Sequence, residues 1–388
     1  MDFELSQDQE NVRIAVASLC QSFDDAYWRQ RDHAGGFPEE FYQAFAQGGW
    51  LGICIPPEYG GSGLGISEAA VMMRTIAQSG AGMSGASALH MNIFGLNPVV
   101  AHGSDAQKLR MLPPIVAGHD KACFAVTEPD TGLNTTRLKT RAVRHKDRFV
   151  VNGQKVWIST AQVANKILLL ARTTPLSDVR KPTDGLSLFY TDLDRRHITV
   201  REIDKMGRKA IDSNELFIED LEIPETDLIG AEGQGFRHIL DGMNPERILI
   251  ASEAIGLGYL ALSKATHYAK ERRVFDRPIG QNQAIQHPLA KNWLALEAAW
   301  LMTLRAANQY DRGLEAGASA NAAKYLAGEA GFDACQQAVM THGGFGYAKE
   351  FHVERYLREV MIARIAPISP QLALCYIAER VLGLPKSY

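Results

Sequence analysis

Cysteine is sparse in this 388-residue sequence, and neither the cysteines nor the histidines have the spacing of a metal or redox site. The five cysteines lie far apart and form no C-x-x-C pair, and the eleven histidines form no H-x-x-x-H or H-E-x-x-H pattern. These absences argue against a disulfide framework and against a zinc site. We therefore expect reduced thiols, no bound metal and a cytoplasmic protein.

An excess of one charge and a long apolar run are missing as well. The 41 basic residues nearly balance the 44 acidic ones, and no Lys/Arg cluster suggests a nucleic-acid partner. No apolar run reaches about 18 residues, so we expect no membrane span. The first residues, Met1-Asp-Phe-Glu-Leu, are acidic and lack the pattern of a secretory signal.

The spacing of apolar residues divides the sequence into three zones, as its length suggests. Residues 1–120 have the pattern of helices broken by Gly and Pro, as in Ile55-Pro-Pro-Glu-Tyr-Gly-Gly-Ser-Gly63. Residues 121–229 contain short strand-like runs, typical of a small antiparallel barrel or sandwich. Residues 230–388 return to the helical period, which predicts a bundle. The sequence thus predicts an α+β protein with an N-terminal helical, a middle β and a C-terminal helical domain.

Local signals predict several individual elements. Asp105 is expected to cap a short helix. Asn152-Gly153 favours positive φ, which predicts a tight hairpin between two strands within residues 148–159. In the third zone, one apolar stripe at helical spacing is interpreted as core. This stripe consists of Ile285, Leu289, Trp293, Leu296, Trp300 and Leu304.

The segment Gly256-Leu-Gly-Tyr-Leu-Ala261 matches the dinucleotide fingerprint G-x-G-x-x-A. That fingerprint works between a strand and the start of a helix, where backbone N–H groups meet a pyrophosphate. Here it lies inside a helical stretch, so we interpret the small residues as a site of close helix packing.

Two neighbouring segments carry the strongest functional pattern. Phe124-Ala-Val-Thr-Glu-Pro129 is followed by Gln154-Lys-Val-Trp-Ile-Ser159. Thr127 and Ser159 each offer a hydroxyl, and Trp157 offers a flat apolar face. A planar heteroaromatic ring with polar edges would use all three. Considered alone, each segment is better explained by structure: the first as a surface Thr-Glu-Pro turn, the second as a buried Trp on a strand.

Together these segments resemble the flavin-holding motif of the acyl-CoA dehydrogenase family, T-E-P-x-x-G-S-D followed by W-I-T/S. The resemblance extends from Asp8 to Leu384 and includes Gly343-Gly-Phe-Gly346. It implies a C-terminal four-helix bundle and FAD as cofactor. The side chains implied to hold the flavin ring are Phe124, Val126, Thr127, Trp157 and Ser159.

The same resemblance implies that the rest of the cofactor crosses a subunit interface, in a homotetramer built as a dimer of dimers. Arg272 would contact the pyrophosphate, for which a permanently charged guanidinium is well suited. Considered alone, Arg272 is better explained as a solvated surface residue, and the Arg-x-x-Phe spacing with Gln283 eleven residues later favours the cofactor role. The other residues implied to contact FAD are Phe275, Gln283, Gly343, Gly344, Ser369 and Gln371.

The catalytic base is expected at an unusual position. Many family members carry a glutamate near the C-terminus, but that position is Pro367 here, which cannot accept a proton. Long-chain and isovaleryl types place the glutamate in E-R-L-x-x-A, which matches Glu246-Arg-Ile-Leu-Ile-Ala251. Glu246 is therefore the candidate base and Arg247 its substrate-side neighbour. The simpler alternative for Glu246 is a carboxylate that stabilises a helix start.

Two further positions depart from the family motif. Leu133 replaces a serine that lies near the acyl-CoA in relatives, and Asn134 replaces the aspartate. We expect Leu133 to face the substrate without a hydrogen bond.

The resemblance implies that an acyl-CoA thioester is oxidised to the trans-2-enoyl-CoA, with electrons passing to an electron-transfer flavoprotein. No side chain accepts hydride, so this chemistry requires a cofactor. The alternatives are an oxygen-reactive relative, such as an acyl-CoA oxidase or flavin hydroxylase, and a silent acyl-CoA- or flavin-binding protein. An NAD-linked enzyme is disfavoured because no proper fingerprint exists.

Overall fold

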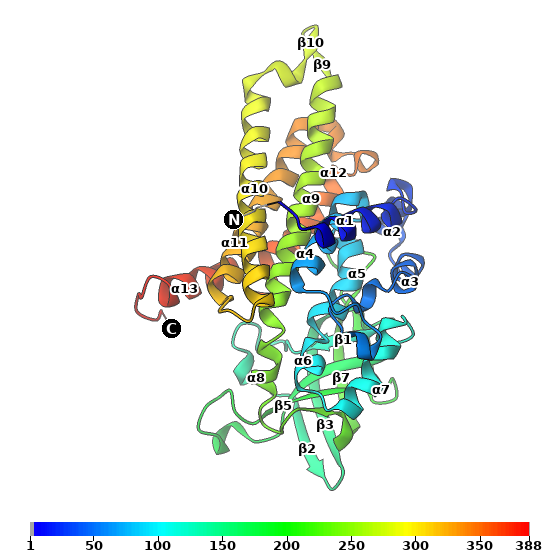
Figure 1. Cartoon of the computed structure of the whole chain (residues 1–388), viewed down its shortest axis with the longest axis vertical. Helices are drawn as coiled ribbons and strands as arrows, with labels where there is room; N and C mark the ends of the chain where they lie inside the picture. Colours follow the sequence, from blue (N-terminus) through cyan, green and yellow to red (C-terminus); the bar gives the residue numbers. More distant parts are fainter. Residues whose placement is uncertain (1–3, 388) are drawn as a thin grey trace.

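The computed structural model describes residues 4–387. The chain is elongated, with the β-sheet near one end and the β9–β10 hairpin at the other (Figure 1). The predicted order of an N-terminal helical, a middle β and a C-terminal helical region is confirmed. The N-terminal helices are α1 (Gln7–Cys20), α2 (Asp25–Ala34), α3 (Glu39–Gln47), α4 (Ile66–Ile76), α5 (Gly82–Phe94), α6 (Asn97–His102) and α7 (Asp105–Val116).

The start of α7 corrects one prediction, because Ser104 and not Asp105 is the cap. The Ser104 hydroxyl accepts a hydrogen bond from the Gln107 N–H at 3.3 Å. The Gln107 side chain accepts in return from the Ser104 N–H at 2.8 Å. This reciprocal capping box leaves Asp105 as the first helical residue, where its charge suits the positive helix end.

The middle region forms one mixed sheet in the order β6-β7-β3-β2-β4-β5-β8, with β1 beside β4. Most neighbours are antiparallel, but β4 pairs in parallel with both β1 and β2. The apolar β4 is buried on both faces, one toward the helices and one toward a separate β core. The strands are β1 (Ala122–Ala125), β2 (Arg141–His145), β3 (Arg148–Ser159), β4 (Lys166–Arg172), β5 (Leu186–Asp192), β6 (Ile198–Glu202), β7 (Ser213–Pro224) and β8 (Leu228–Ile229).

The hairpin predicted at Asn152-Gly153 is wrong. β3 runs unbroken through both residues, and the hairpin turn lies earlier, between β2 and β3, with Lys146 at φ 55°. Asn152 instead exchanges hydrogen bonds with Asp220 on β7. Gly153 permits close backbone contact, because a Cβ there would lie 2.4 Å from the Thr140 hydroxyl. Both residues therefore lie at a shift in the register between β3 and β7.

The C-terminal helices pack as a bundle in which α9 contacts α10, α11 and α12. Gly256 and Gly258 lie inside α9, and a Cβ on Gly256 would meet the Arg74 carbonyl at 2.2 Å. The interpretation of these glycines as close-packing residues is confirmed. The elements are α8 (Gly235–Leu240), α9 (Met243–Glu271), β9 (Arg273–Val274), β10 (Arg277–Pro278), α10 (Gln283–Asp311), α11 (Gly317–His342), α12 (Val353–Ile365) and α13 (Pro370–Arg380).

The apolar stripe of α10 is core only in part. Leu296 and Trp300 are buried, whereas Trp293 is 49% exposed in the single chain. Leu294 and Leu301 are exposed on the same helix. An apolar stripe in the sequence shows which residues could be buried. Which of them neighbouring helices cover depends on the packed structure.

Two helical segments are long and apolar enough to cross a membrane by length and composition alone. The first, residues 235–271, is a core helix, since 78% of its apolar window is buried. The second, residues 353–380, comprises α12 and α13, between which the chain leaves the helix before Ser369 caps α13. The sequence predicted no membrane span because it contains no uninterrupted apolar run of about 18 residues. In this second segment 17% of the apolar window is buried.

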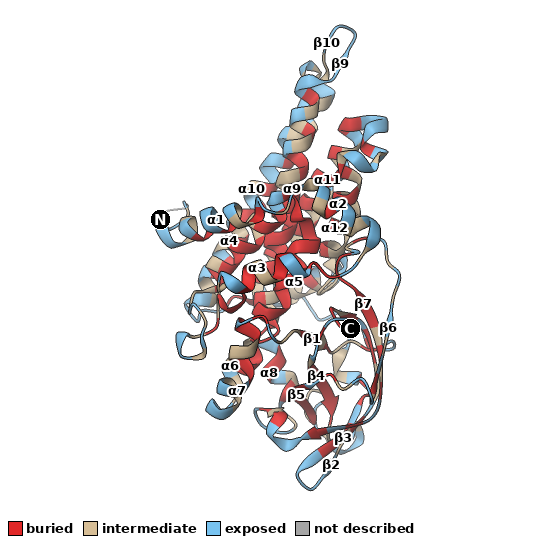
Figure 2. Cartoon of the chain, turned by 90° about the vertical axis from the view of Figure 1, so that its right-hand side faces the viewer, coloured by how far each residue is buried: buried red, intermediate tan, exposed pale blue. Residues whose placement is uncertain are grey.

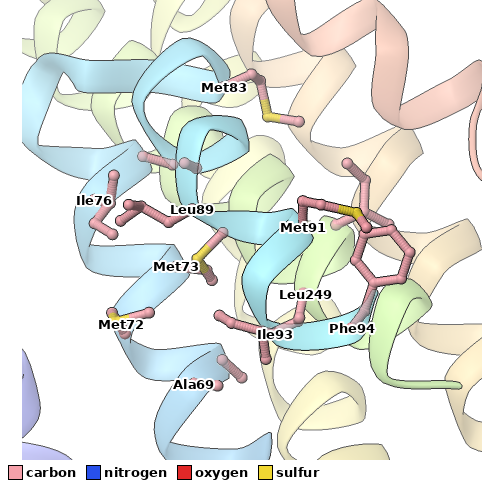
Figure 3. Close-up of a cluster of buried hydrophobic side chains, with 14 of the residues drawn as sticks. Ala69, Met72, Met73, Ile76, Met83, Leu89, Met91, Ile93, Phe94 and Leu249 are labelled. Atoms are coloured by element: carbon pink, nitrogen blue, oxygen red, sulfur yellow. The ribbon is translucent and has the colours of Figure 1, made fainter. Parts of the chain in front are cut away.

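The main helical core lies where α4, α5 and α9 meet (Figure 2). Figure 3 shows its unusual composition, in which Met72, Met73, Met83 and Met91 pack around Leu89 and Leu249. Methionine side chains are flexible and fill irregular space. This adaptable core surrounds α5, which carries several of the polar side chains described below.

Candidate active site

The Thr-Glu-Pro segment is fastened to β3 by a buried ion pair. The Lys155 ammonium lies 2.9 Å from the Glu128 carboxylate and donates to the Val126 carbonyl at 3.0 Å. Glu128 also accepts from the backbone N–H groups of Lys139 and Thr140. Burial lowers the pKa of Lys155 to about 8, and Glu128 opposes that shift, so both groups are charged at neutral pH. The pair fixes where Thr127 lies.

A β-bulge in β3 turns Trp157 outward. The register shifts between Lys155 and Ile158, and Trp157 adopts φ 62°, which is rare for a bulky residue. Its ring is 59% exposed although both flanking residues are buried. Backbone strain of this kind costs on the order of 1–3 kcal/mol and is concentrated at functional sites. The arrangement presents a flat aromatic face that the chain itself does not cover.

The remaining ring-holding candidates lie around this face. The Val156 N–H donates to the Thr127 carbonyl at 2.9 Å, so Thr127 lies beside the Trp157 strand. Thr127, Val126, Ser159 and Phe124 are all half-buried. The Phe124 ring contacts Phe94 of α5 edge-on, with centroids 5.1 Å apart. The structure therefore places Val126 and Thr127 beside the strand that carries Trp157 and Ser159, and Phe124 against α5.

Glu246 lies in the first turn of α9, next to the end of α5. A Cβ on Gly242, just before α9, would lie 2.8 Å from the Phe94 carbonyl, which shows how closely the two helices approach. Burial raises the pKa of Glu246 to about 7, while the charges of His90 and Arg247 limit the rise. A carboxyl group with a pKa near neutrality is well matched to general-base chemistry.

The two family positions for the base converge on one region. Arg247 donates to the Asn244 side chain at 3.0 Å and interacts electrostatically with Lys324 and Tyr376. Buried Lys324 donates to the Ile368 carbonyl at 2.6 Å and so holds the loop that contains Pro367. Arg247 and Lys324 thus link the start of α9, which carries Glu246, to the loop that contains Pro367.

A second group of predicted residues lies at the opposite end of α9. Arg272 follows the last residue of that helix, and its guanidinium lies 5.8 Å from the Phe345 ring centroid. Phe275 and Asp276 form the β9–β10 turn with φ of 52° and 61°, and Phe275 is 93% exposed. Gln283 begins α10 and is exposed.

Gly343 and Gly344 belong to the same distant group. Both are exposed, and a Cβ on either would meet no atom within 4 Å. His342 just before them is buried at the end of α11 and stacks on Tyr268 with centroids 4.3 Å apart. This histidine therefore has a packing partner and is not a loop residue.

The remaining predicted residues belong to α13 and to the loop that contains Leu133 and Asn134. Ser369 caps α13, accepting from the Leu372 N–H at 3.3 Å, and Gln371 is exposed on that helix. Leu133 is 67% exposed in the loop before Asn134. The side chain of Asn134 accepts from Thr136 at 2.6 Å.

Sequence reasoning missed three features of this site. The Glu128–Lys155 pair and the Trp157 bulge depend on tertiary contacts, and no local signal marks them. The third feature is a buried pair between His90 on α5 and Glu253 on α9. Within residues 4–387, no group of three or more His, Cys, Asp or Glu side chains is arranged to hold a metal. All five cysteines are free.

Comparison with known proteins agrees with this architecture along nearly the whole chain. The profile "Acyl-CoA dehydrogenase, N-terminal domain" matches residues 6–119, "Acyl-CoA dehydrogenase, middle domain" matches residues 123–221 and "Acyl-CoA dehydrogenase, C-terminal domain" matches residues 233–382. The chain belongs to the acyl-CoA dehydrogenase family. Enzymes of this family are oxidoreductases that act on CH–CH groups.

Individual relatives are similar over their full length. Acyl-CoA dehydrogenase fadE12 of Mycobacterium bovis is 35% identical, with 99% of this chain and 98% of that protein aligned. The caffeyl-CoA reductase–Etf complex subunit CarC of Acetobacterium woodii is 32% identical over 90% of this chain and 92% of its own. Among solved structures, the FAD complex of PigA has a TM-score of 0.93 at 26% identity and covers 99% of this chain and 100% of PigA.

Proposed function

We propose that the protein oxidises an acyl-CoA thioester to the trans-2-enoyl-CoA, with Glu246 as the base that removes the α-proton. The observation that carries this proposal is a half-buried carboxyl group with a pKa near 7. Its neighbour Arg247 interacts electrostatically with Lys324, which holds the loop of Pro367. At neutral pH a substantial fraction of Glu246 is deprotonated and able to accept a proton.

Each neighbouring residue has a defined task in this reaction. Arg247 is half-buried, keeps its charge and favours the ionised form of Glu246. Backbone hydrogen-bond donors near the thioester would stabilise charge on its carbonyl oxygen as the α-proton leaves. The β-carbon loses a hydride, which FAD accepts when bound. The products are the enoyl-CoA, the reduced cofactor and one proton on Glu246.

FAD fits the side chains at the sheet end of the chain. Trp157 offers an exposed aromatic side chain, and Thr127, Ser159, Phe124 and Val126 are half-buried, so the hydroxyls of Thr127 and Ser159 would hydrogen-bond the edges of the ring. The similarity to an FAD complex supports the same cofactor here.

The proposed FAD contacts require more than one subunit. Residue 246 and Arg272 lie at opposite ends of α9, whose 29 residues span about 43 Å. One FAD molecule cannot contact both groups within a single chain. Arg272, Phe275, Gln283, Gly343 and Gly344 would therefore serve the FAD of a neighbouring subunit. We assign Ser369 and Gln371 to the cofactor as well.

We infer that the assembly is a homotetramer located in the cytoplasm. Apolar side chains exposed on α10 and around α13 support subunit contacts there: Trp293, Leu294, Leu301, Leu374, Val381, Leu382 and Leu384. The Etf association named for the CarC relative supports an electron-transfer flavoprotein as the electron acceptor. Leu133 and Arg247 would line the substrate side.

An anaerobic titration of the purified protein with a panel of acyl-CoA thioesters tests this function. We expect a yellow preparation that releases FAD and bleaches on mixing with at least one saturated acyl-CoA. A protein that binds FAD and acyl-CoA without bleaching would be the silent binding protein. Rapid peroxide formation in air would instead identify an oxygen-reactive relative.

A further inference from the structure

The helices beside Glu246 contain a buried polar pair that the proposed reaction does not use. His90 on α5 is 7% exposed, and Glu253 on α9 is fully buried. Nδ1 of His90 and the Glu253 carboxylate form a short hydrogen bond. Burying two polar side chains between helices is costly unless each of their groups is satisfied. The pair is therefore not explained by packing alone.

Two atoms of this pair lack a partner. No group within residues 4–387 hydrogen-bonds to Nε2 of His90 or to the second oxygen of Glu253, although both atoms are buried. The Arg208 guanidinium interacts electrostatically with Glu253, and it donates to the Ser87 hydroxyl at 2.9 Å, one turn from His90 on α5. His90 and Arg208 are thus the two neighbours of the Glu253 carboxyl group, and Nε2 of His90 is the ring atom without a hydrogen-bond partner among residues 4–387.

The location of His90 connects it to the reaction site. Glu246 and Glu253 are seven residues apart on α9, about 10 Å or two turns, and so lie on one face. His90 interacts electrostatically with Glu246. Its ring also meets Phe94 edge-on at 4.8 Å, and Phe94 meets Phe124 at 5.1 Å. His90 therefore lies between Glu246 and the segment around Phe124 that is proposed to hold the flavin ring.

We propose that His90, oriented by Glu253, recognises an oxygen atom on the acyl group of the substrate, several carbons beyond the thioester. The protein would then prefer hydroxylated or carbonyl-bearing acyl-CoA thioesters over plain alkyl ones. This inference rests on the proposed function. Nδ1 of His90 faces a carboxylate, so Nε2 is the atom free to bind substrate. Without a proton Nε2 accepts a hydrogen bond, and with a proton it donates one. A hydroxyl group can pair with Nε2 in either form.

The alternative is a plain apolar acyl site, and it predicts the opposite preference. A hydroxyl that enters an apolar pocket loses its hydration without gaining a partner. An alkyl chain of equal size would then be the better substrate. The sign of the preference therefore distinguishes recognition by His90 from burial among apolar side chains.

The test compares ω-hydroxyacyl-CoAs of four to eight carbons, each with the alkyl-CoA one carbon longer, which has the same number of heavy atoms. We expect at least one hydroxylated member to exceed its alkyl match in kcat/KM by about fivefold or more, the value of one hydrogen bond. The gain should appear in KM, with similar flavin bleaching at saturation. A wild-type protein that favours the alkyl member at every length overturns the inference.

Variants assign the preference to the pair. The His90→Leu/Glu253→Leu double variant removes both polar groups together and avoids a buried unpaired carboxylate. It should retain FAD and oxidise alkyl-CoAs, yet lose the preference for the hydroxyl. His90→Gln, which retains an N–H donor, should keep part of the preference. An unchanged preference in the double variant overturns the inference, whereas failure of every acyl-CoA to bleach the flavin rejects the proposed dehydrogenase function itself.

Discussion

At the sheet end of α9, Glu128, Lys155 and the Trp157 bulge hold a candidate cofactor surface through contacts within one chain. At the opposite end, Arg272, Phe275 and the 343–344 glycines project into solvent with few contacts. The first group is completed by folding. The second group becomes a site only if a neighbouring subunit supplies the ligand, so stability and assembly should respond to mutations at different ends of the molecule.

Lys155→Met should have the largest effect on the candidate cofactor surface at the sheet end of α9. It leaves the Glu128 carboxylate buried without its cation, which should lower the free energy of unfolding by about 3–5 kcal/mol. Denaturant unfolding of the FAD-free protein measures this loss. Lys139→Met is the matched control, since the Lys139–Asp130 pair is exposed and should leave stability near wild type. Equal stability of the two variants would contradict a pre-built surface.

The far end is tested by Arg272→Ala. The exposed side chain contributes little to the fold of one chain, but the loss of a charged hydrogen bond should weaken FAD retention roughly 10- to 100-fold. Flavin content after gel filtration and sedimentation velocity measure cofactor and assembly together. Arg196→Ala, another exposed arginine, should change neither. Full flavin content and unchanged assembly in Arg272→Ala would refute a shared cofactor site.

The pH dependence of flavin reduction tests the electrostatics of the base. Glu246 must be ionised to accept a proton, and burial raises its pKa to about 7. Below that pH, kcat/KM should therefore fall about tenfold per unit, and above it the value should level off. A profile that stays flat from pH 5 to 8 would show that Glu246 is ionised throughout or is not the base.

The smallest predicted effect concerns Leu133. Leu133→Ser adds a hydroxyl that relatives use near the acyl-CoA, so affinity for acyl-CoA should change several-fold, the value of about 1 kcal/mol. Flavin content should stay constant, and equilibrium titration measures both. A change in flavin content alone would place Leu133 on the cofactor side.

The sequence predicted the three-part fold because apolar period changes sharply between zones, from helical to strand-like and back. It failed where a contact distant in sequence decides the local shape. Asn152-Gly153 has the local preference of a hairpin, but pairing with Asp220 on β7 keeps β3 continuous. The positive φ of Trp157 likewise comes from a β-bulge that no residue type in the local sequence predicts.

The candidate site was predictable where a motif is continuous, as around Thr127 and Ser159. The choice of Glu246 as the candidate base followed from a family pattern and from the proline at position 367. The burial that raises the pKa of Glu246 became visible only in the structure. The His90–Glu253 pair joins residues 163 positions apart, so its proximity emerges only when α5 packs on α9.

The most direct test of the central claim is stopped-flow flavin reduction by Glu246→Gln under anaerobic conditions. Glutamine keeps the shape of the side chain and its hydrogen bonding but cannot take the α-proton. The variant should fold, retain FAD and bind acyl-CoA, while its flavin is reduced ~10²–10⁴-fold more slowly than in wild type. Adding Pro367→Glu to this variant should restore part of the rate if the two base positions share one substrate. Near-normal reduction by Glu246→Gln would contradict the assignment of the base.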